Sequence, residues 1–254
     1  MNRRKFIKSG ALFLPAFSIF VPRLIRAQSI LTAEGLAAYV PPAAGGGGGG
    51  ITLLGSGVIA GSTDENTVTT GPYNTTTAKL IVIAEATTFG AVTPTDSKSN
   101  TWTQIIGEPS FGSAYCSLWY CLNPTTDAAH TFSASTVNTH PTLGVFAFTG
   151  LVSGALDQHN GSFNASGGAT TVSTGAITPS GDGYLIVANA SYDSGTSSSW
   201  DSGLGGALNK GWIIFQNTGL GVAFKAQSVA ASINATCTLG GSSQACAAIA
   251  SFVK

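Results

Sequence analysis

The chain has 254 residues, and only 9% of them are charged, whereas roughly a quarter is usual for a soluble globular domain. Six of its 11 basic residues lie within the first 27 positions, so the rest carries five lysines against 11 acidic residues, a net charge of 5 − 11 = −6. Binding to nucleic acid rests on clustered Lys and Arg, and these lysines are scattered singly. The composition therefore argues against a nucleic-acid partner and favours an extracellular β-rich protein.

The first 27 residues have the three-part layout of a secretory signal. A basic opening, Arg3-Arg4-Lys5-Phe6-Ile7-Lys8, precedes an apolar run over residues 10–21, and Ala27 supplies a small residue at the end. The apolar run is shorter than the roughly 20 residues that span a bilayer, so no membrane span is expected after signal removal. The paired arginines resemble a twin-arginine export signal, with an ordinary Sec signal as the alternative. Either route predicts a periplasmic or extracellular location.

Residues 28–50 are expected to form a short helix followed by a flexible linker. Residues 32–39 suit about two turns of helix, and after Pro41-Pro42 come six consecutive glycines, Gly45 to Gly50. A run of glycines cannot hold a fixed backbone. The folded domain is therefore expected to include residues 51–254.

After the linker, nearly every apolar run is short and bounded by Gly, Asn, Asp, Ser or Pro, which predicts β-strands. The run 79–84, which is apolar after Lys79, and the apolar run 184–188 are typical of strands that are buried on both faces. Several runs also recur at a spacing of 104 residues. The matching segments are 67–71 with 171–175, 80–84 with 184–188, 118–120 with 222–224, and 143–148 with 247–252.

This spacing predicts an all-β fold with two copies of one unit, over residues 52–150 and 156–254. Each copy alone would leave one apolar sheet face wet, and packing two sheets face to face would bury both. The expected architecture is an internally duplicated antiparallel β-sandwich of the jelly-roll or concanavalin-like type.

The third matched segment indicates which face of its strand lies inside. Residues 118 and 120 are apolar in both copies, whereas Trp119 corresponds to Ala223. Since side chains alternate between the two faces of a strand, the shared apolar positions are expected to face the core. Trp119 is then expected to face the other way, either exposed or covered by a loop.

Three segments of the first copy together resemble a recurrent β-sandwich module of secreted bacterial proteins and phage tail or head-fibre proteins. They are the turn-rich stretch 95–103, the later Ser-Leu-Trp-Tyr strand at 117–120, and Phe148-Thr-Gly-Leu151 before Leu156-Asp157. The resemblance covers about half of the chain and implies architecture rather than activity. It leaves open a non-catalytic module that binds a polysaccharide or cell-surface glycan, a self-associating fibre or virion component, and an exported polysaccharide hydrolase or lyase.

Candidate catalytic groups are sparse. Sandwich glycosidases and lyases use paired carboxylates that flank the scissile bond, yet Glu85 stands alone after an apolar run, and its counterpart at the 104-residue spacing is Asn189. Asp157 and His159 share a face if the chain is extended there, but no Gly-x-Ser-x-Gly elbow accompanies them. These patterns favour a non-catalytic module, with Glu85, Asp157 and His159 as the candidates of the enzymatic alternative.

Aromatic side chains are the more promising binding groups. Trp119 is expected to point outwards, and Trp102, Tyr192 and Trp200 lie in or beside polar, loop-like sequence. Aromatic rings offer large, rigid faces that stack on sugar rings. These four residues are therefore the candidate glycan-binding residues, with packing at the ends of the sandwich as the alternative.

Oxygen-bearing loop residues are the candidates for a metal site. A calcium ion at Asp96 and Asn100, or at Asp193 and Asp201, would suit their ligand chemistry. Asx-turns explain the same residues without a metal.

Four cysteines raise the question of disulfides, because an exported protein meets an oxidising environment. Cys237 and Cys246 flank a stretch that suits a hairpin centred on residues 241–242, which would place them opposite each other and predicts a bond between them. Cys116 and Cys121 lie in one expected strand and would face opposite sides, so they cannot bond each other there. Their pairing stays open.

Overall fold

The computed structural model describes residues 50–254, apart from residues 56, 62–65, 107–109, 112–113, 136–139, 165–167, 193–197, 201–207 and 216–217. The predicted signal and short helix, and the calcium candidates Asp193 and Asp201, lie outside the described residues. All elements that are described are β-strands, which confirms the all-β class. A bilayer-spanning helix is not found in this part of the chain.

The described strands follow one another along the chain in this order: β1 (Thr52–Leu53), β2 (Val58–Gly61), β3 (Thr67–Thr69), β4 (Leu80–Thr87), β5 (Thr95–Asp96), β6 (Thr103–Ile106), β7 (Ser110–Phe111), β8 (Ala114–Leu122), β9 (Phe132–Ser135), β10 (Thr142–Thr149), β11 (Leu156–Phe163), β12 (Ala169–Ser173), β13 (Tyr184–Tyr192), β14 (Ser198–Trp200), β15 (Leu208–Phe215), β16 (Thr218–Gln227), β17 (Thr236–Ser243) and β18 (Ala245–Phe252).

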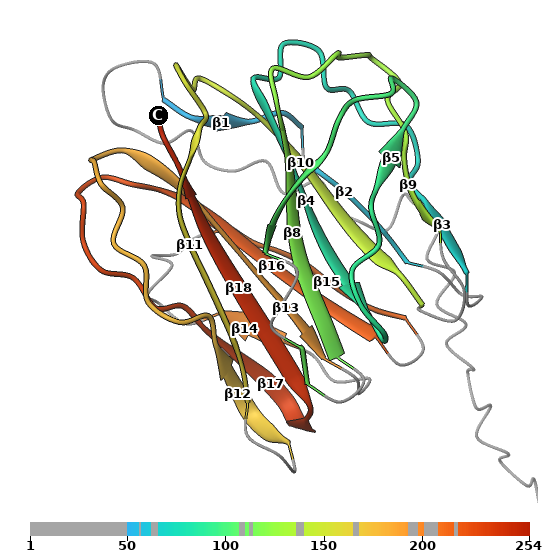
Figure 1. The fold of residues 1–254 in the computed structure, drawn as a ribbon, viewed down its shortest axis with the longest axis vertical. Helices are drawn as coiled ribbons and strands as arrows, with labels where there is room; N and C mark the ends of the chain where they lie inside the picture. Colours follow the sequence, from blue (N-terminus) through green and yellow to red (C-terminus); the bar gives the residue numbers. More distant parts are fainter. Residues whose placement is uncertain are drawn as a thin grey trace, which may run out of the picture. The chain divides into compact units, whose positions relative to one another are not determined.

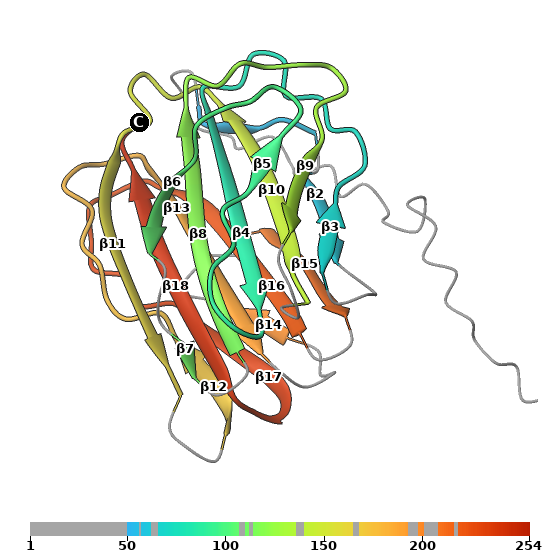
Figure 2. The ribbon, with the colours of Figure 1, turned by 45° about the vertical axis from the view of Figure 1, so that its right-hand side comes forward.

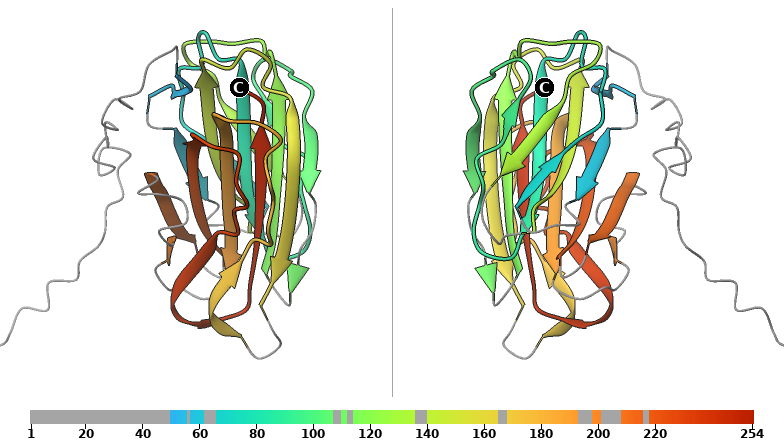
Figure 3. Two further views of the ribbon diagram at one scale, coloured as in Figure 1. Left: turned by 90° about the vertical axis from the view of Figure 1, so that its left-hand side faces the viewer. Right: turned by 90° about the vertical axis from the view of Figure 1, so that its right-hand side faces the viewer.

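The strands form two large and two small antiparallel sheets (Figure 1). The first large sheet has the order β1-β10-β4-β8-β6, with β2 beside β10 and β7 beside β8, and the first small sheet is β3-β9-β5. The second large sheet is β11-β18-β13-β16-β15, and the second small sheet is β12-β17-β14. In Figure 2 the long strands of both large sheets fill the middle of the molecule, and in Figure 3 they run in roughly the same direction.

A central core fills the space between the two large sheets. Alternate residues of β4, such as Leu80 and Val82, meet residues of the second large sheet that include Val222, Phe224 and Phe252. The two large sheets also meet through aromatic rings that pack edge to face: the ring centroids of Phe148 and Phe224 are 5.3 Å apart, and the angle between the ring planes is 80°. Packing these two apolar faces together removes both from water, which is the main driving force for joining the halves.

Each large sheet is also covered on its outer face. Ile81 and Ile83 of β4 point away from the central core and pack with Phe132 of the first small sheet in a first outer core. Ile186 of β13 packs in the same way with Cys237 of the second small sheet, in a second outer core. The fold is thus a β-sandwich four layers deep, with a small sheet on the outside of each large one.

The two halves correspond strand by strand, which confirms the internal duplication. The order β10-β4-β8-β6 repeats as β18-β13-β16-β15, and β3-β9-β5 repeats as β12-β17-β14. The isolated bridge between Tyr73 and His130 has its counterpart between Ile177 and Ile233. One-dimensional repetition in the sequence therefore reflects the same strand topology built twice.

The register of β4 and β13 differs by one residue from the predicted match. Leu118 pairs with Ala84, and the equivalent residue Val222 pairs with Asn189. Since 222 − 118 is 104 but 189 − 84 is 105, the identical triplets Leu-Ile-Val at 80–82 and 185–187 are the true equivalents. Glu85 therefore corresponds to Ala190 and not to Asn189. A shift of one residue turns every side chain of a strand to the other face, so the correction changes which positions can be compared.

The predicted hairpin and disulfide between Cys237 and Cys246 are wrong. The strand that holds Cys237 pairs with β12 and β14, and the strand that holds Cys246 pairs with β11 and β13. The chain passes from the small sheet to the large sheet at Gln244, so the two strands lie in different layers. Cys237 lies in the second outer core and Cys246 in the central core, and the two are not joined by a disulfide.

Candidate functional site

The catalytic candidate Glu85 lies near the end of β4, and its side chain is buried under the first small sheet with only 1% of its surface exposed. It pairs across the sheet with Ser117 of β8, whose hydroxyl donates a hydrogen bond to its carboxylate. Trp119 Nε1 donates to Glu85 Oε2 at 3.0 Å, and the backbone N–H of Val92 donates to Oε1 at 3.0 Å. The carboxyl group is thus enclosed by donors of the protein itself.

Burial raises the pKa of Glu85 from its ordinary value of 4.5 to about 7, against the hydrogen bonds from Ser117, Trp119 and Val92, which favour the ionised form. A carboxyl group that titrates near neutral pH has the right proton affinity for general acid–base catalysis. Geometry opposes that role in this conformation, because the buried oxygens are taken by internal donors and offer no place for a substrate oxygen.

The aromatic binding candidates are largely buried. Trp119 faces away from the central core, as predicted, but the first small sheet covers it and leaves 5% exposed. Tyr192 is fully buried and Trp200 is 8% exposed, both in the second outer core. Trp102 is half-buried, and its ring meets that of Phe132 edge to face at 6.0 Å. The prediction of an exposed aromatic platform is not supported, because the outer faces of the large sheets are themselves covered.

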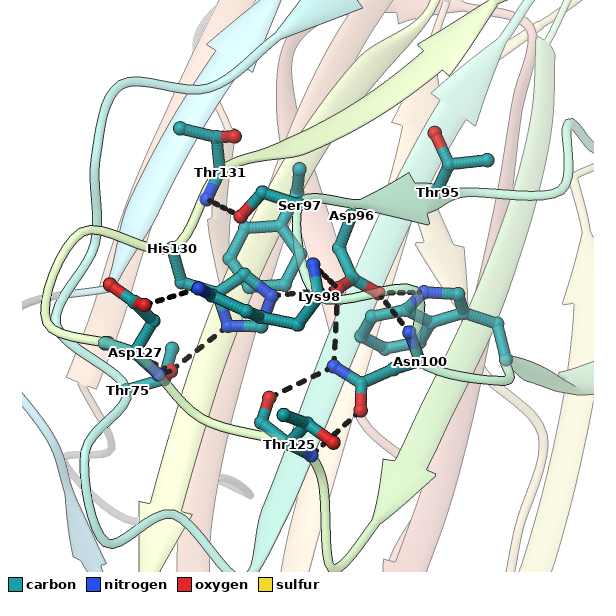
Figure 4. A network of polar contacts seen from close by, with 12 residues as sticks. Thr75, Thr95, Asp96, Ser97, Lys98, Asn100, Thr125, Asp127, His130 and Thr131 are labelled. Carbon is teal, nitrogen blue, oxygen red and sulfur yellow. Dashed lines mark hydrogen bonds and ion pairs between the residues drawn. The ribbon is translucent and has the colours of Figure 1, made fainter.

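A second polar cluster surrounds Asp96 of β5 (Figure 4). Its carboxylate lies 2.8 Å from His130 Nε2, and both side chains are fully buried. Trp102 Nε1 donates to Asp96 Oδ2 at 2.9 Å, and the backbone N–H of Lys98 donates to Oδ1 at 2.7 Å in an Asx-turn. Asn100 adds bonds from its backbone N–H and its side-chain amide, both at 3.2 Å.

These contacts leave the calcium prediction at Asp96 and Asn100 without support. The carboxylate oxygens of Asp96 accept hydrogen bonds from five donors within the protein. The side chain of Asn100 accepts a hydrogen bond from the backbone N–H of Thr125 at 2.7 Å and donates one to the carbonyl of Thr125 at 3.1 Å. The Asx-turn alternative is what the structure shows. Across the described ranges, no three His, Cys, Asp or Glu side chains gather as metal ligands.

The same cluster contains a hydroxyl, an imidazole and a carboxylate in series, the order found in nucleophile triads. Thr75 Oγ1 lies 3.0 Å from His130 Nδ1, and His130 Nε2 continues to Asp96. Thr75 is fully buried, however, and its hydroxyl also bonds to the backbone of Asp127, to the carbonyl at 3.2 Å and from the N–H at 3.1 Å. The series therefore fastens the turn before β9 to β5 rather than exposing a nucleophile.

Asp157 and His159 are not joined into one site. Asp157 accepts hydrogen bonds from Ser180, from its hydroxyl at 2.6 Å and its N–H at 3.0 Å, and from Ser251 Oγ at 3.0 Å. Burial raises the pKa of Asp157, but hydrogen bonds from Ser180, Ser251 and Gln158 outweigh it and hold the pKa below the ordinary value. His159 is exposed on β11, opposite Ala250. Asp157 thus connects β11, β18 and the turn before β13.

The most regular exposed feature is a face of hydroxyl groups on each small sheet. On the first small sheet, Thr67 Oγ1 lies 2.8 Å from Ser135 Oγ, and Thr69 Oγ1 lies 2.9 Å from Ser133 Oγ. Thr95 of β5 stands beside Ser133 on the same solvent side. The first hydroxyl face is defined by these five residues, whose neighbours Val68, Phe132 and Ala134 point inwards.

The second small sheet repeats the paired hydroxyl groups of β3 and β9 at the equivalent positions of β12 and β17. Ser173 Oγ lies 3.0 Å from Thr236 Oγ1, and Thr171 pairs with Thr238 as Thr67 pairs with Ser135. Ser199 of β14 pairs with Thr238 from the other side. These five residues form the second hydroxyl face. The sequence signal for both faces is a hydroxyl residue on each side of an apolar one, in Thr-Val-Thr, Ser-Ala-Ser, Thr-Val-Ser and Thr-Cys-Thr.

No family model, curated protein or solved structure matches the chain. The resemblance to an export signal and to secreted or phage β-sandwich modules therefore stays a prediction. In the structure, the carboxylates at positions 85, 96 and 157 accept hydrogen bonds from within the protein, whereas the two hydroxyl faces lie on the solvent side of the small sheets.

Proposed function

We propose that this chain is an exported, non-catalytic module that binds neutral polysaccharide through its two hydroxyl faces. The observation that supports the proposal is the matching arrays of exposed and half-buried Ser and Thr on the solvent side of both small sheets. Alternate residues along a strand stand about 6.6–6.8 Å apart and neighbouring strands about 4.8 Å apart, so each array is a flat grid of donors and acceptors. A flat grid suits an extended polymer better than a small molecule that needs an enclosing pocket.

Charge favours a neutral polymer. None of the ten residues in the two hydroxyl faces is ionisable, and the chain after position 27 carries a net charge of −6. An acidic polysaccharide would be repelled by that net charge at low ionic strength, and it would find no cation on either face. Hydroxyl groups both donate and accept hydrogen bonds, which matches the sugar hydroxyls of a neutral glycan.

The duplication gives the module two binding faces that point away from each other. The four layers run from the first small sheet through the two large sheets to the second small sheet, so the hydroxyl faces lie on the two outer surfaces of the described fold. One molecule with two such faces would bridge two polymer chains. Bivalent contact raises the apparent affinity for an insoluble polymer without any new interaction at either face.

The proposal is tested by co-sedimentation with insoluble cellulose, chitin and peptidoglycan, using paired variants of cross-strand partners. Thr67→Glu with Ser135→Lys alters the first face, and Thr171→Glu with Thr238→Lys alters the second. Opposite charges placed on cross-strand partners preserve sheet stability and net charge, so a loss of binding reports on the face itself.

We expect wild type to bind at least one neutral polymer and to bundle its fibres. Each face variant should bind more weakly and lose bundling, and the four-fold variant should lose binding. A matched control, Thr76→Glu with Ser228→Lys at exposed positions outside both faces, should behave as wild type.

Unchanged binding of the four-fold variant would overturn the role of the hydroxyl faces. Absence of polysaccharide binding by wild type, together with assembly into fibres or particles, would replace the proposal with a fibre or virion component. Release of reducing ends that is lost in Glu85→Gln would instead establish the hydrolase alternative.

A further inference from the structure

Two cysteines from opposite halves meet in the central core. Cys116 belongs to β8 of the first large sheet and Cys246 to β18 of the second, and these two strands pack against each other. Both residues are fully buried, and their side chains are hydrogen-bonded to each other. They are 246 − 116 = 130 residues apart, so only the packing of the two halves brings them together.

We propose that Cys116 and Cys246 form a disulfide that ties the two halves together through the central core. The other two cysteines are separated from this pair by a sheet. Cys121 alternates to the outer side of β8, and Cys237 lies in the second outer core. Face-to-face sheets can be bridged in this way by a disulfide between two inward side chains.

The reaction removes one hydrogen from each thiol and forms one S–S bond. The two electrons and two protons pass to a disulfide oxidant, either a thiol oxidase of the compartment or a small disulfide such as oxidised glutathione, which is reduced to two thiols. Attack requires a thiolate, and burial raises the pKa of Cys116 well above its ordinary value, an effect that Cys246 and Glu85 reinforce. Oxidation is therefore fast while the halves are still open and slow once the central core has closed.

The bond would restrict the unfolded chain over a long loop, which is the situation in which a cross-link has its largest entropic effect. The two halves would then be held together by a covalent bond in addition to the hydrophobic contact between the large sheets. The same thiols in a reducing environment would leave the fold intact but more easily unfolded.

The test is oxidative refolding of the full chain from urea in a mixture of reduced and oxidised glutathione, followed by thiol counting and non-reducing peptide mapping. We expect two free thiols instead of four, a mass lower by two hydrogens, and a cross-linked peptide that contains Cys116 and Cys246. Oxidant added after folding should act much more slowly than oxidant present during folding.

Single variants assign the bond. Cys121→Ala and Cys237→Ala should retain the cross-link, and Cys116→Ala and Cys246→Ala should lose it. Reduction should lower the midpoint of urea unfolding of oxidised wild type, and it should lower the midpoint of oxidised Cys121→Ala by the same amount. Four free thiols after oxidative refolding of wild type, or a cross-link that contains Cys121 or Cys237, would overturn the proposal even if the core variants fail to fold.

Discussion

The two halves share one backbone plan but fill the same place with different chemistry. In the first half, Glu85 pairs with Ser117, and Trp119 reaches over both. In the second half, the equivalent pair is Ala190 with Gly221. A buried carboxyl group is therefore no requirement of this fold, since the sister half forms the same sheet from small residues.

Aromatic rings from other positions fill the space in the second half. Tyr192 is fully buried against β16, and a Cβ added at Gly219 would lie 2.0 Å from its ring. Gly219 is thus needed as glycine for close approach of the ring rather than for an unusual backbone angle. Trp200 packs in the same second outer core. The halves reach similar burial by unrelated side chains.

Other contacts are kept in both halves. The backbone N–H of Phe132 donates to Thr70 Oγ1 at 3.0 Å, and the N–H of Ala235 donates to Thr174 Oγ1 at 3.1 Å. In contrast, the polar residue His130 corresponds to the apolar Ile233. Backbone-linked hydroxyl bonds therefore belong to the common plan, whereas the buried clusters around Glu85 and Asp96 have no counterpart among the described residues of the second half.

The largest expected effect is that of removing the indole over the carboxyl group. Trp119→Ala should lower the free energy of unfolding by about 4 kcal/mol, because it leaves a cavity and also removes a donor from Glu85. Trp200→Ala in the second half is the matched comparison, since it leaves a cavity in a core without a carboxyl group. Urea denaturation of both variants should show the larger loss of unfolding free energy for Trp119→Ala. Equal losses would mean that the hydrogen bond from the Trp119 indole to Glu85 adds nothing to stability.

Next in size is the pH dependence that Glu85 imposes on the first half. Its pKa is raised from 4.5 to about 7 on folding, so the native state binds more protons than the unfolded state between these values. The contribution of Glu85 to the free energy of unfolding is therefore fully present below pH 4.5, and it is lost as the pH rises through 7, by up to about 3 kcal/mol. Glu85→Gln should abolish this fall, as measured by urea unfolding at a series of pH values.

Asp157 provides the control of opposite sign. Its pKa is lowered from 3.8, so its contribution is present above that value and is lost as the pH falls below it. Asp157→Asn should leave the change between pH 4.5 and 7 intact. A fall in stability over that range that persists in Glu85→Gln would show that another group is responsible.

The smallest expected effect concerns the contact that both halves share. Thr70→Val and Thr174→Val each leave one backbone N–H without its hydroxyl acceptor, and each should cost about 1 kcal/mol in unfolding free energy. The two losses should agree, because the two bond lengths are 3.0 and 3.1 Å. A large difference between them would show that the halves differ in rigidity as well as in side chains.

The sequence allowed much of the fold to be predicted, and its errors share a cause. The repeat and the inward direction of residues 118 and 120 were predicted from spacing and alternation. A single spacing of 104 fails at β4 because the identical Leu-Ile-Val triplets at 80–82 and 185–187 are 105 residues apart. The candidate binding residues follow from their chemistry alone, whereas the further layers bury Trp119, Tyr192 and Trp200.

A signal for that further layer was present in the chain. Residues 80–84 and 184–188 are apolar at every position. This predicts strands buried on both faces, and β4 is indeed buried along its whole length. A two-layer sandwich would leave one face of such strands in water. The continuous apolar runs therefore required a cover on each outer side, which the small sheets supply.

By itself, the sequence determined the all-β class and the duplication, because alternation and repetition are properties of a single chain read along its length. Only the tertiary structure decided which faces of the sheets are exposed to solvent and which cysteines lie next to each other. Both depend on segments far apart in the chain, as when Cys116 and Cys246 come together across the central core. Exposure and proximity are properties of packed layers, and no single strand contains them.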